Sequence, residues 1–368
     1  HPPDAAFIGV NRHKTIEIVR ELNNMGAGGA VCFASGFSET EIKTDNEDGQ
    51  ELQRKLIDAA PTLALLGPNC YGFLNYLDNV ALWPDQHGGH RVKEGVAIIA
   101  QSSNIAINLT MQKRSLPIAF IVTVGNQAKS GISDIIQILL TDDRVTTIGL
   151  YIEGFDNIQK FEAAAFKAVV CKKPLVILKA GKTAHSVATA FSHTASITGS
   201  NTASSTFLAR IGCLEVNSLS NMLETLKFLH FNGYMHSPSI ASVSCSGGEA
   251  SLIADQASET LIHYKPFEKT TKEKLKALLG PIVTVSNPFD YHTFIWGDEK
   301  KMAEIFSTVL GNPFELVLFL LDVPRKDLCD DTSFHCAINA IIATAKASAG
   351  KIAVASSLPE SMPEDLAK

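Results

Sequence analysis

The chain has 368 residues, of which 45% are hydrophobic and 19% charged, and this is enough for two or three domains that each bury a core. The formal net charge is −6, and a polyanion would need a basic face, so nothing favours nucleic acid and we expect none as a partner. The seven cysteines are scattered and form no C-x-x-C pair, which argues against a zinc site or disulfide framework and favours the reducing cytoplasm. The longest apolar runs have the length of a strand, so we predict no membrane segment and no signal peptide.

The two ends of the sequence look like internal positions of a longer protein. The first residue is His1, a strand-like run begins at Ala5, and the last residues resemble the start of a helix. We therefore expect this sequence to be a piece of a longer chain. We also expect the opening βαβ unit of the first domain, where a Gly-rich phosphate loop normally lies, to be missing.

Strand-length apolar runs alternate with helix-length amphipathic segments, which predicts an α/β fold with parallel sheets and crossover helices. Residues 1–90 are predicted to form half of a doubly wound domain, with strands at 5–10, 29–33 and 63–66 and helices at 15–24 and 50–59. Residues 91–233 predict a flavodoxin-like domain, with strands at 96–100, 118–122, 147–152 and 175–178 and helices at 199–210 and 220–230. Residues 238–368 predict a second one, with strands at 240–245, 316–321 and 352–354.

Two strands end in small residues that open a helix, one at Ser102 and Ser103 and the other at Ser246, Gly247 and Gly248. The free backbone N–H groups and the dipole of such a helix start can bind phosphate without a basic side chain. The alternative is an ordinary tight turn, because small residues are common between strand and helix in any α/β protein.

His193 lies in a stretch of small and hydroxyl residues after the strand at 175–178, and Glu153 ends the strand at 147–152. Imidazole can act as a nucleophile and form a covalent intermediate. A carboxylate at the ligand-binding edge of a sheet could hold one ring nitrogen, so that the other is free to attack. The alternatives are an ordinary loop histidine and a solvated carboxylate.

The segment at 67–72 follows a strand, so its Asn69 and Cys70 are expected at the ligand-binding edge of the sheet. The alternative is a plain turn. Cys70 is not favoured as a nucleophile, because no base lies close to it in the sequence.

Six short motifs together give a resemblance that covers essentially the whole chain. They lie at residues 67–70, 101–103, 151–154, 179–182, 192–194 and 246–248. In this order the chain resembles the NDP-forming acyl-CoA synthetases, relatives of succinyl-CoA synthetase. The resemblance implies a partial Rossmann-like CoA-binding domain followed by two flavodoxin-like domains. It also implies that an acid, CoA and ATP react to acyl-CoA, ADP and phosphate through an acyl phosphate and a phosphohistidine.

The same resemblance implies the roles of individual residues. His193 would take the phosphoryl group, Glu153 would orient it, and the two helix starts would hold the phosphate. Gly36, Phe37, Asn69 and Cys70 would lie at CoA. The residues that depart from the family pattern are Ala195, Ser103 and Glu249, each at a position where a smaller residue is usual.

The resemblance further implies an ATP-grasp domain that binds ATP with Mg²⁺, on a second subunit or further along the chain. This domain is not in the sequence, so we expect no ATP turnover by these residues alone. We predict a small carboxylic acid as substrate, an oligomeric enzyme, and no metal site within these residues. The identity of the acid, the nucleotide and the physiological direction stay open.

Tyr291, His292, Phe294 and Trp296 follow an Asn-Pro-x-Asp turn within six residues. Aromatic faces can surround a cation, so one hypothesis is an acid that carries an onium group, or an aromatic acid. The alternative is that these side chains pack the core of their domain.

Two other classes of function stay open beside the synthetase. The first is a non-catalytic or regulatory CoA-binding module, such as the one fused to lysine acetyltransferases, which would tolerate the loss of His193. The second is a flavodoxin-like redox or NAD-binding protein, against which the missing G-x-G-x-x-G counts.

Overall fold

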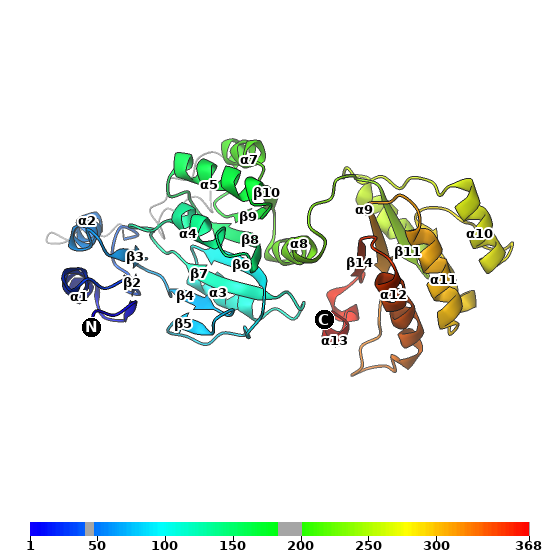
Figure 1. Cartoon of the computed structure of the whole chain (residues 1–368), viewed down its shortest axis with the longest axis horizontal. Helices are drawn as coiled ribbons and strands as arrows, with labels where there is room; N and C mark the ends of the chain where they lie inside the picture. The colour runs from blue at the N-terminus through cyan, green and yellow to red at the C-terminus, as the bar shows by residue number, and fades with distance from the viewer. Residues whose placement is uncertain (41–47, 183–200, 368) are drawn as a thin grey trace. The chain divides into compact units, whose positions relative to one another are not determined.

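The computed structural model describes residues 1–40, 48–182 and 201–367. It divides into two compact units, His1–Phe231 and Asn232–Lys368. In the described part, the first unit contains a sheet of three strands and a sheet of seven, and the second contains a sheet of four (Figure 1). Nearly all neighbouring strands run parallel, so the predicted α/β class is confirmed.

The small sheet has the parallel order β1-β2-β3, made by Ala6–Ile8, Gly29–Cys32 and Ala64–Leu66. Its helices are α1 (Arg12–Met25) and α2 (Gly49–Ala59), which pack against each other. Helix α1 begins where the Asn11 side chain accepts the backbone N–H of Lys14, and it ends at Gly26 in the left-handed region. The helix buries a face spaced at one turn, namely Thr15, Ile16, Val19 and Leu22.

The large sheet has the strand order β10-β9-β8-β6-β7-β4-β5. Five of these strands are parallel: β6 (Gly95–Ala100), β7 (Ile118–Thr123), β8 (Val145–Ile152), β9 (Leu175–Lys179) and β10 (Leu214–Val216). The short strands β4 (Phe73–Asn75) and β5 (Val80–Leu82) form a hairpin, and β4 adds antiparallel to β7. All six residues of the central strand β6 are buried, as expected for a parallel strand covered on both faces.

Helices cover both faces of this sheet. Helices α4 (Ile132–Leu139), α5 (Ile158–Val170) and α7 (Asn201–Arg210) contribute buried side chains to one core cluster with β6, β8 and β9. Helix α8 (Leu219–Asn232) packs on the opposite face of β8, where a Cβ at Gly149 would come within 2.7 Å of Leu226 and Met222. Helix α3 (Ser103–Thr110) follows β6 directly.

The order of the parallel strands contains a topological switch point. From β6 the chain passes to β7 on one side and then to β8 on the other, so the crossovers leave in opposite directions. Ligands of doubly wound sheets bind outside the carboxyl ends of the strands at this point. The switch point here lies between the ends of β6 and β8.

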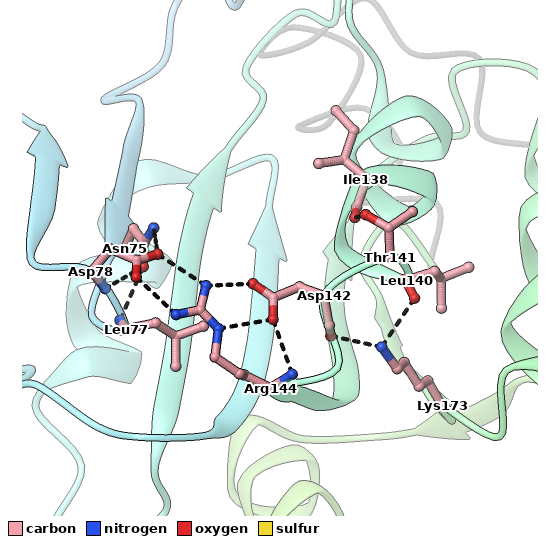
Figure 2. A network of polar contacts seen from close by, with 9 residues as sticks. All are labelled: Asn75, Leu77, Asp78, Ile138, Leu140, Thr141, Asp142, Arg144 and Lys173. Atoms are coloured by element: carbon pink, nitrogen blue, oxygen red, sulfur yellow. Dashed lines mark hydrogen bonds and ion pairs between the residues drawn. The ribbon is translucent and has the colours of Figure 1, made fainter.

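At the opposite, amino edge of the large sheet, charged groups are paired (Figure 2). The Arg144 guanidinium, just before β8, donates to Asp78 in the β4–β5 hairpin at 2.8 and 3.0 Å and to Asp142 at 2.8 and 3.0 Å. Lys173, before β9, is buried and donates to the carbonyl oxygens of Leu140 and Asp142 at 3.0 and 2.7 Å. These bonds tie the hairpin and two loops together.

The second unit has the sheet order β12-β11-β13-β14, all parallel, made by Phe289–Asp290, Ile240–Ser244, Leu316–Leu320 and Ile352–Ala355. Its helices are α9 (Gly247–Ala257), α10 (Lys269–Leu279), α11 (Glu299–Leu310), α12 (His335–Ala347) and α13 (Glu364–Ala367). The switch point of this sheet lies between β11 and β13.

The strands and helices predicted from the sequence are present within a few residues of their predicted bounds wherever the structure describes them. The hairpin β4–β5 was not predicted. It lies before the predicted boundary at residue 90, yet its strands belong to the large sheet. The division into domains at 90 and 233–238 stays a prediction.

Candidate functional site

A cleft of about 920 Å³ opens at the carboxyl edge of the first unit. It is lined by segments that follow five different strands: residues 9–13, 33–35, 69–71, 101–104 and Glu153. Both sheets of the unit therefore contribute, and the switch point between β6 and β8 forms part of the wall. Residues predicted from three separate motifs meet in this one cleft, namely Asn69 and Cys70, Ser102 and Ser103, and Glu153.

Gln101 and Glu153 lie side by side where β6 and β8 end. The backbone N–H of Gln101 donates to the carbonyl of Tyr151 at 3.0 Å. In the other direction, the Gln101 Oε1 atom accepts the backbone N–H groups of both Glu153 and Gly154, the latter at 2.9 Å. Glu153 is half-buried, and its Oε2 atom is shielded from solvent. Burial, and secondly the charge of Glu153, raise the pKa of the nearby Tyr151 hydroxyl.

Helix α3 starts at the cleft wall. Its N-cap is Ser102, whose hydroxyl accepts the backbone N–H of Ile105 at 3.4 Å. The Ser103 hydroxyl accepts the backbone N–H of Tyr71 at 3.1 Å. This bond gives a physical reason for a serine where the family pattern has glycine, because the side chain holds the neighbouring segment instead of filling the cleft.

The segment at 67–72 is fixed at several points. Gly67 has φ +96°, and a Cβ there would lie 2.7 Å from the Cys32 carbonyl oxygen. Asn69 also has a positive φ, and its backbone N–H donates to Ala34 at 2.9 Å. Cys70 is 1% exposed, and burial raises the pKa of its thiol to about 12. A thiol that stays protonated is a poor nucleophile, in agreement with the expectation from the sequence.

The segment at 36–39 is held by a buried carboxylate. Glu39 accepts the backbone N–H groups of Gly36 and Phe37, and the Asn126 side chain donates to it as well. Gly36 has φ +94°, and a Cβ there would lie 2.6 Å from the guanidinium of Arg12. The Phe37 ring is 0% exposed in the core of the small sheet, so of this predicted CoA residue only the backbone can face a ligand.

Sequence reasoning missed the start of α1, where Asn11, Arg12 and His13 line the cleft. These residues directly follow β1, so the rule that applied to the other strand ends could have found them. A cationic Arg12 beside a helix N-terminus makes this wall suited to an anionic ligand.

His193 and Ala195 lie outside the described residues. The last described strand before them is β9, whose last residue Lys179 is 3% exposed and donates to the Ala180 carbonyl at 3.0 Å. Burial lowers the pKa of this amine. Lys182, the last described residue before the gap, pairs with Glu215 at 2.6 Å.

In the second unit, Ser246 caps α9 and accepts the backbone N–H of Gly248 at 3.2 Å. Gly247, Gly248 and Glu249 form the first turn of this helix. The pKa of Glu249 is raised to about 7, chiefly by burial and then by the charge of Asp322. A protonated Glu249 would remove the conflict between a carboxylate and a phosphate at this position, and whether the turn binds phosphate stays a prediction.

The aromatic residues at 291–296 do not gather around one site. Tyr291 is 2% exposed and packs edge-on against Phe306 at 5.2 Å, and Trp296 packs edge-on against Phe334 at 5.1 Å. His292 instead stacks on Phe294, which is 69% exposed. Tyr291 and Trp296 thus contribute to the core of the second unit, and their role in binding a substrate stays a prediction.

Across the described residues, no cluster of three or more His, Cys, Asp or Glu side chains is arranged to hold a metal ion. The helices in the described part of the chain are all too short or too polar to cross a membrane.

Comparison with known proteins agrees with the geometry of the first unit. Residues 93–229 match the family described as succinyl-CoA ligase like flavodoxin domain. A trans-feruloyl-CoA synthase from an unknown prokaryotic organism is 29% identical over 83% of this chain and 44% of its own length. The alpha subunit of the ADP-forming acetate–CoA ligase II from Pyrococcus furiosus is 28% identical over 78% of this chain and 62% of its own length. Over most of its length the chain is thus similar to ADP-forming CoA ligases, and residues 93–229 match the succinyl-CoA ligase like flavodoxin domain.

The solved structures extend this result to the fold. The acetyl-coenzyme A synthetase 1 of Ca. Korarchaeum cryptofilum, a dinucleotide-forming enzyme solved with phosphate and ADP, superimposes with a TM-score of 0.82 at 23% identity. The match covers 98% of this chain and 76% of that one. The predicted combination of a Rossmann-like part with succinyl-CoA ligase-like flavodoxin domains is therefore confirmed as the fold of this chain. The chain spans about half the length of the curated relatives it matches.

Proposed function

We propose that this chain is the CoA-side, phosphohistidine-bearing part of an acyl-CoA synthetase that converts an acid, CoA and ATP to acyl-CoA, ADP and phosphate. The observation that carries the proposal is the cleft of about 920 Å³ at the switch point. Its walls include the predicted CoA residues Asn69 and Cys70, the start of α3 and the carboxylate of Glu153. A thioester and a phosphoryl group must meet in such a reaction, and one cleft can hold both.

The described residues suit three tasks in this chemistry. The backbone N–H groups at Ser102 and Ser103 open α3, so they can hold a phosphoryl group without a counter-ion. Arg12 and the start of α1 would face the anionic part of CoA. Glu153 would accept one N–H of the His193 imidazole and so orient the other ring nitrogen, which carries the phosphoryl group. In the direction of synthesis the carboxylate of the acid attacks this phosphorus and releases His193, and the CoA thiol then attacks the carbonyl carbon of the acyl phosphate and releases phosphate.

The second half of the reaction needs a nucleotide-binding partner. We infer an ATP-grasp domain, on the same chain or a second subunit, that moves the phosphoryl group between His193 and ADP with Mg²⁺. The Pyrococcus relative is named as a subunit alpha, which supports a partner subunit of this kind. The acid would be a small carboxylic acid, for which the names of the relatives offer acetate and an aromatic acid.

The test is phosphorylation of the full-length protein, with its ATP-grasp part, by ATP labelled in the γ-position. We expect an acid-labile, base-stable label that maps to His193 and is absent from His193→Ala. A label that persists in this variant, or that maps to another residue, would refute the proposal. Binding of CoA without any label would instead favour the non-catalytic CoA-binding module.

A further inference from the structure

The turn that carries Glu153 is held at both of its ends. At one end, the backbone N–H groups of Glu153 and Gly154 both donate to the Oε1 atom of Gln101. At the other end, Asp156 accepts the backbone N–H of Ser133 at 3.1 Å and its hydroxyl at 2.7 Å, which ties the turn to α4. The backbone of the turn is thereby fixed on two sides, and the Glu153 side chain is left to line the cleft.

Gln101 is unusual for a residue at this depth. It is 4% exposed, and its Nε2 atom is buried and makes no hydrogen bond in the described structure. Core packing would be better served by an apolar side chain, because a buried donor without a partner is costly. The part of the carboxamide that the fold does use is the oxygen, and both of its bonds go to the residue that faces the cleft and the one after it.

We propose that Gln101 is a positioning residue, which sets the direction of the Glu153 carboxylate by fixing the two backbone N–H groups at the end of β8. The inference rests on the proposed function, in which Glu153 orients the imidazole of His193. Small displacements of such a group reduce rate strongly, because the reacting atoms must be held in one geometry. Gln101 therefore acts on the reaction through Glu153 and does not itself need to touch the phosphoryl group.

The contact can be tested without any activity, by amide hydrogen exchange of residues 151–155 in the intact protein. We expect Gln101→Met to speed exchange of the Glu153 and Gly154 amides by about tenfold, since each loses its acceptor. Gln101→Glu keeps an oxygen at the same reach and is expected to restore slow exchange. Gln112→Met is the matched control, because Gln112 Oε1 also accepts a backbone N–H, from Arg114 at 2.7 Å, away from the cleft. Unchanged exchange in Gln101→Met would overturn the inference.

The effect on chemistry is tested by a double-mutant cycle on the rate of His193 phosphorylation. We expect Gln101→Met to slow the wild-type protein by about tenfold to thirtyfold and to change the Glu153→Gln variant by less than about twofold. Equal losses in both backgrounds, or a loss matched by Gln112→Met, would show a merely structural role and overturn the inference alone. A wild-type protein that takes no label on His193 would refute the proposed function and with it this role in catalysis, while the exchange result would still decide the contact.

Discussion

The two edges of the large sheet use polar residues in opposite ways. At the amino edge, Arg144 pairs with Asp78 and Asp142, and Lys173 donates to two carbonyl oxygens. These charged groups therefore have their partners within the fold. At the carboxyl edge, Gln101 keeps a buried amide donor without a bond in the described structure, and polar residues line a cleft of about 920 Å³. A functional edge can thus be recognised by the polar groups that the fold does not use.

The pKa values fit the same contrast. Hydrogen bonds from Arg144 and then Asn75 lower the pKa of Asp78 to about 2, as expected for a paired carboxylate. At the carboxyl edge of the four-stranded sheet in the second unit, burial and the charge of Asp322 raise the pKa of Glu249 to about 7. Groups whose pKa is shifted toward neutrality by burial gather at functional sites more often than paired surface groups do.

The largest effect is expected at the carboxyl edge. Glu153→Gln should slow phosphorylation of His193 by about 10²–10⁴-fold, because an amide orients the imidazole less well than a carboxylate. The melting temperature should stay close to that of the wild-type protein. Rapid-quench labelling and circular dichroism measure the two quantities, and a nearly normal labelling rate would reduce Glu153 to a solvated carboxylate.

At the amino edge, Lys173→Met is expected to lower the stability of the fold and to leave ligand binding unchanged. This change leaves the carbonyl oxygens of Leu140 and Asp142 without their donor, which costs about 1–3 kcal/mol of folding free energy. The midpoint of thermal unfolding should fall by about 2–4 °C per kcal/mol, with no change in CoA affinity. A loss of CoA affinity at unchanged stability would break the distinction between the edges.

The smallest effect concerns pH and the second unit. The pKa of Glu249 is about 7 in the folded protein against an ordinary 4.5, so the folded state binds this proton more tightly. Stability from this group is therefore fully present below about pH 4.5 and is lost as pH rises to about 7. Glu249→Gln should raise the melting temperature at about pH 8, where Glu249 is charged, and leave it unchanged at about pH 4, where Glu249 is neutral. The rise should be only about 2 °C, because solvent screens the charge of a half-exposed group. A difference that grows toward low pH would contradict the assignment.

Much of this arrangement could be predicted from the sequence, and the reason lies in local signals. Continuous apolar runs such as β6, followed two residues later by an N-cap serine, predict both a buried strand and a helix start at the ligand edge. The hairpin β4–β5 carries only three residues per strand, and its place depends on pairing with β7, some forty residues later. No local pattern contains that information.

The sequence predicted which residues line the site better than it predicted the contacts that these residues make. The motifs pointed to Asn69, Ser102 and Glu153, which do line one cleft. They could not show that the Phe37 ring is buried in the core, or that Gln101 holds the backbone of Glu153. Such contacts depend on which side of a strand end faces the neighbouring sheet, and only the folded chain determines this.

The central claim is that the carboxyl edge binds CoA and the amino edge does not. Amide hydrogen exchange of the full-length protein, with and without millimolar CoA, tests it most directly. We expect slower exchange on CoA binding in segments that line the cleft, at 33–35, 69–71 and 101–104, and unchanged exchange at 75–78 and 142–146. Protection confined to the amino edge, or CoA binding that leaves the cleft segments unchanged, would contradict it.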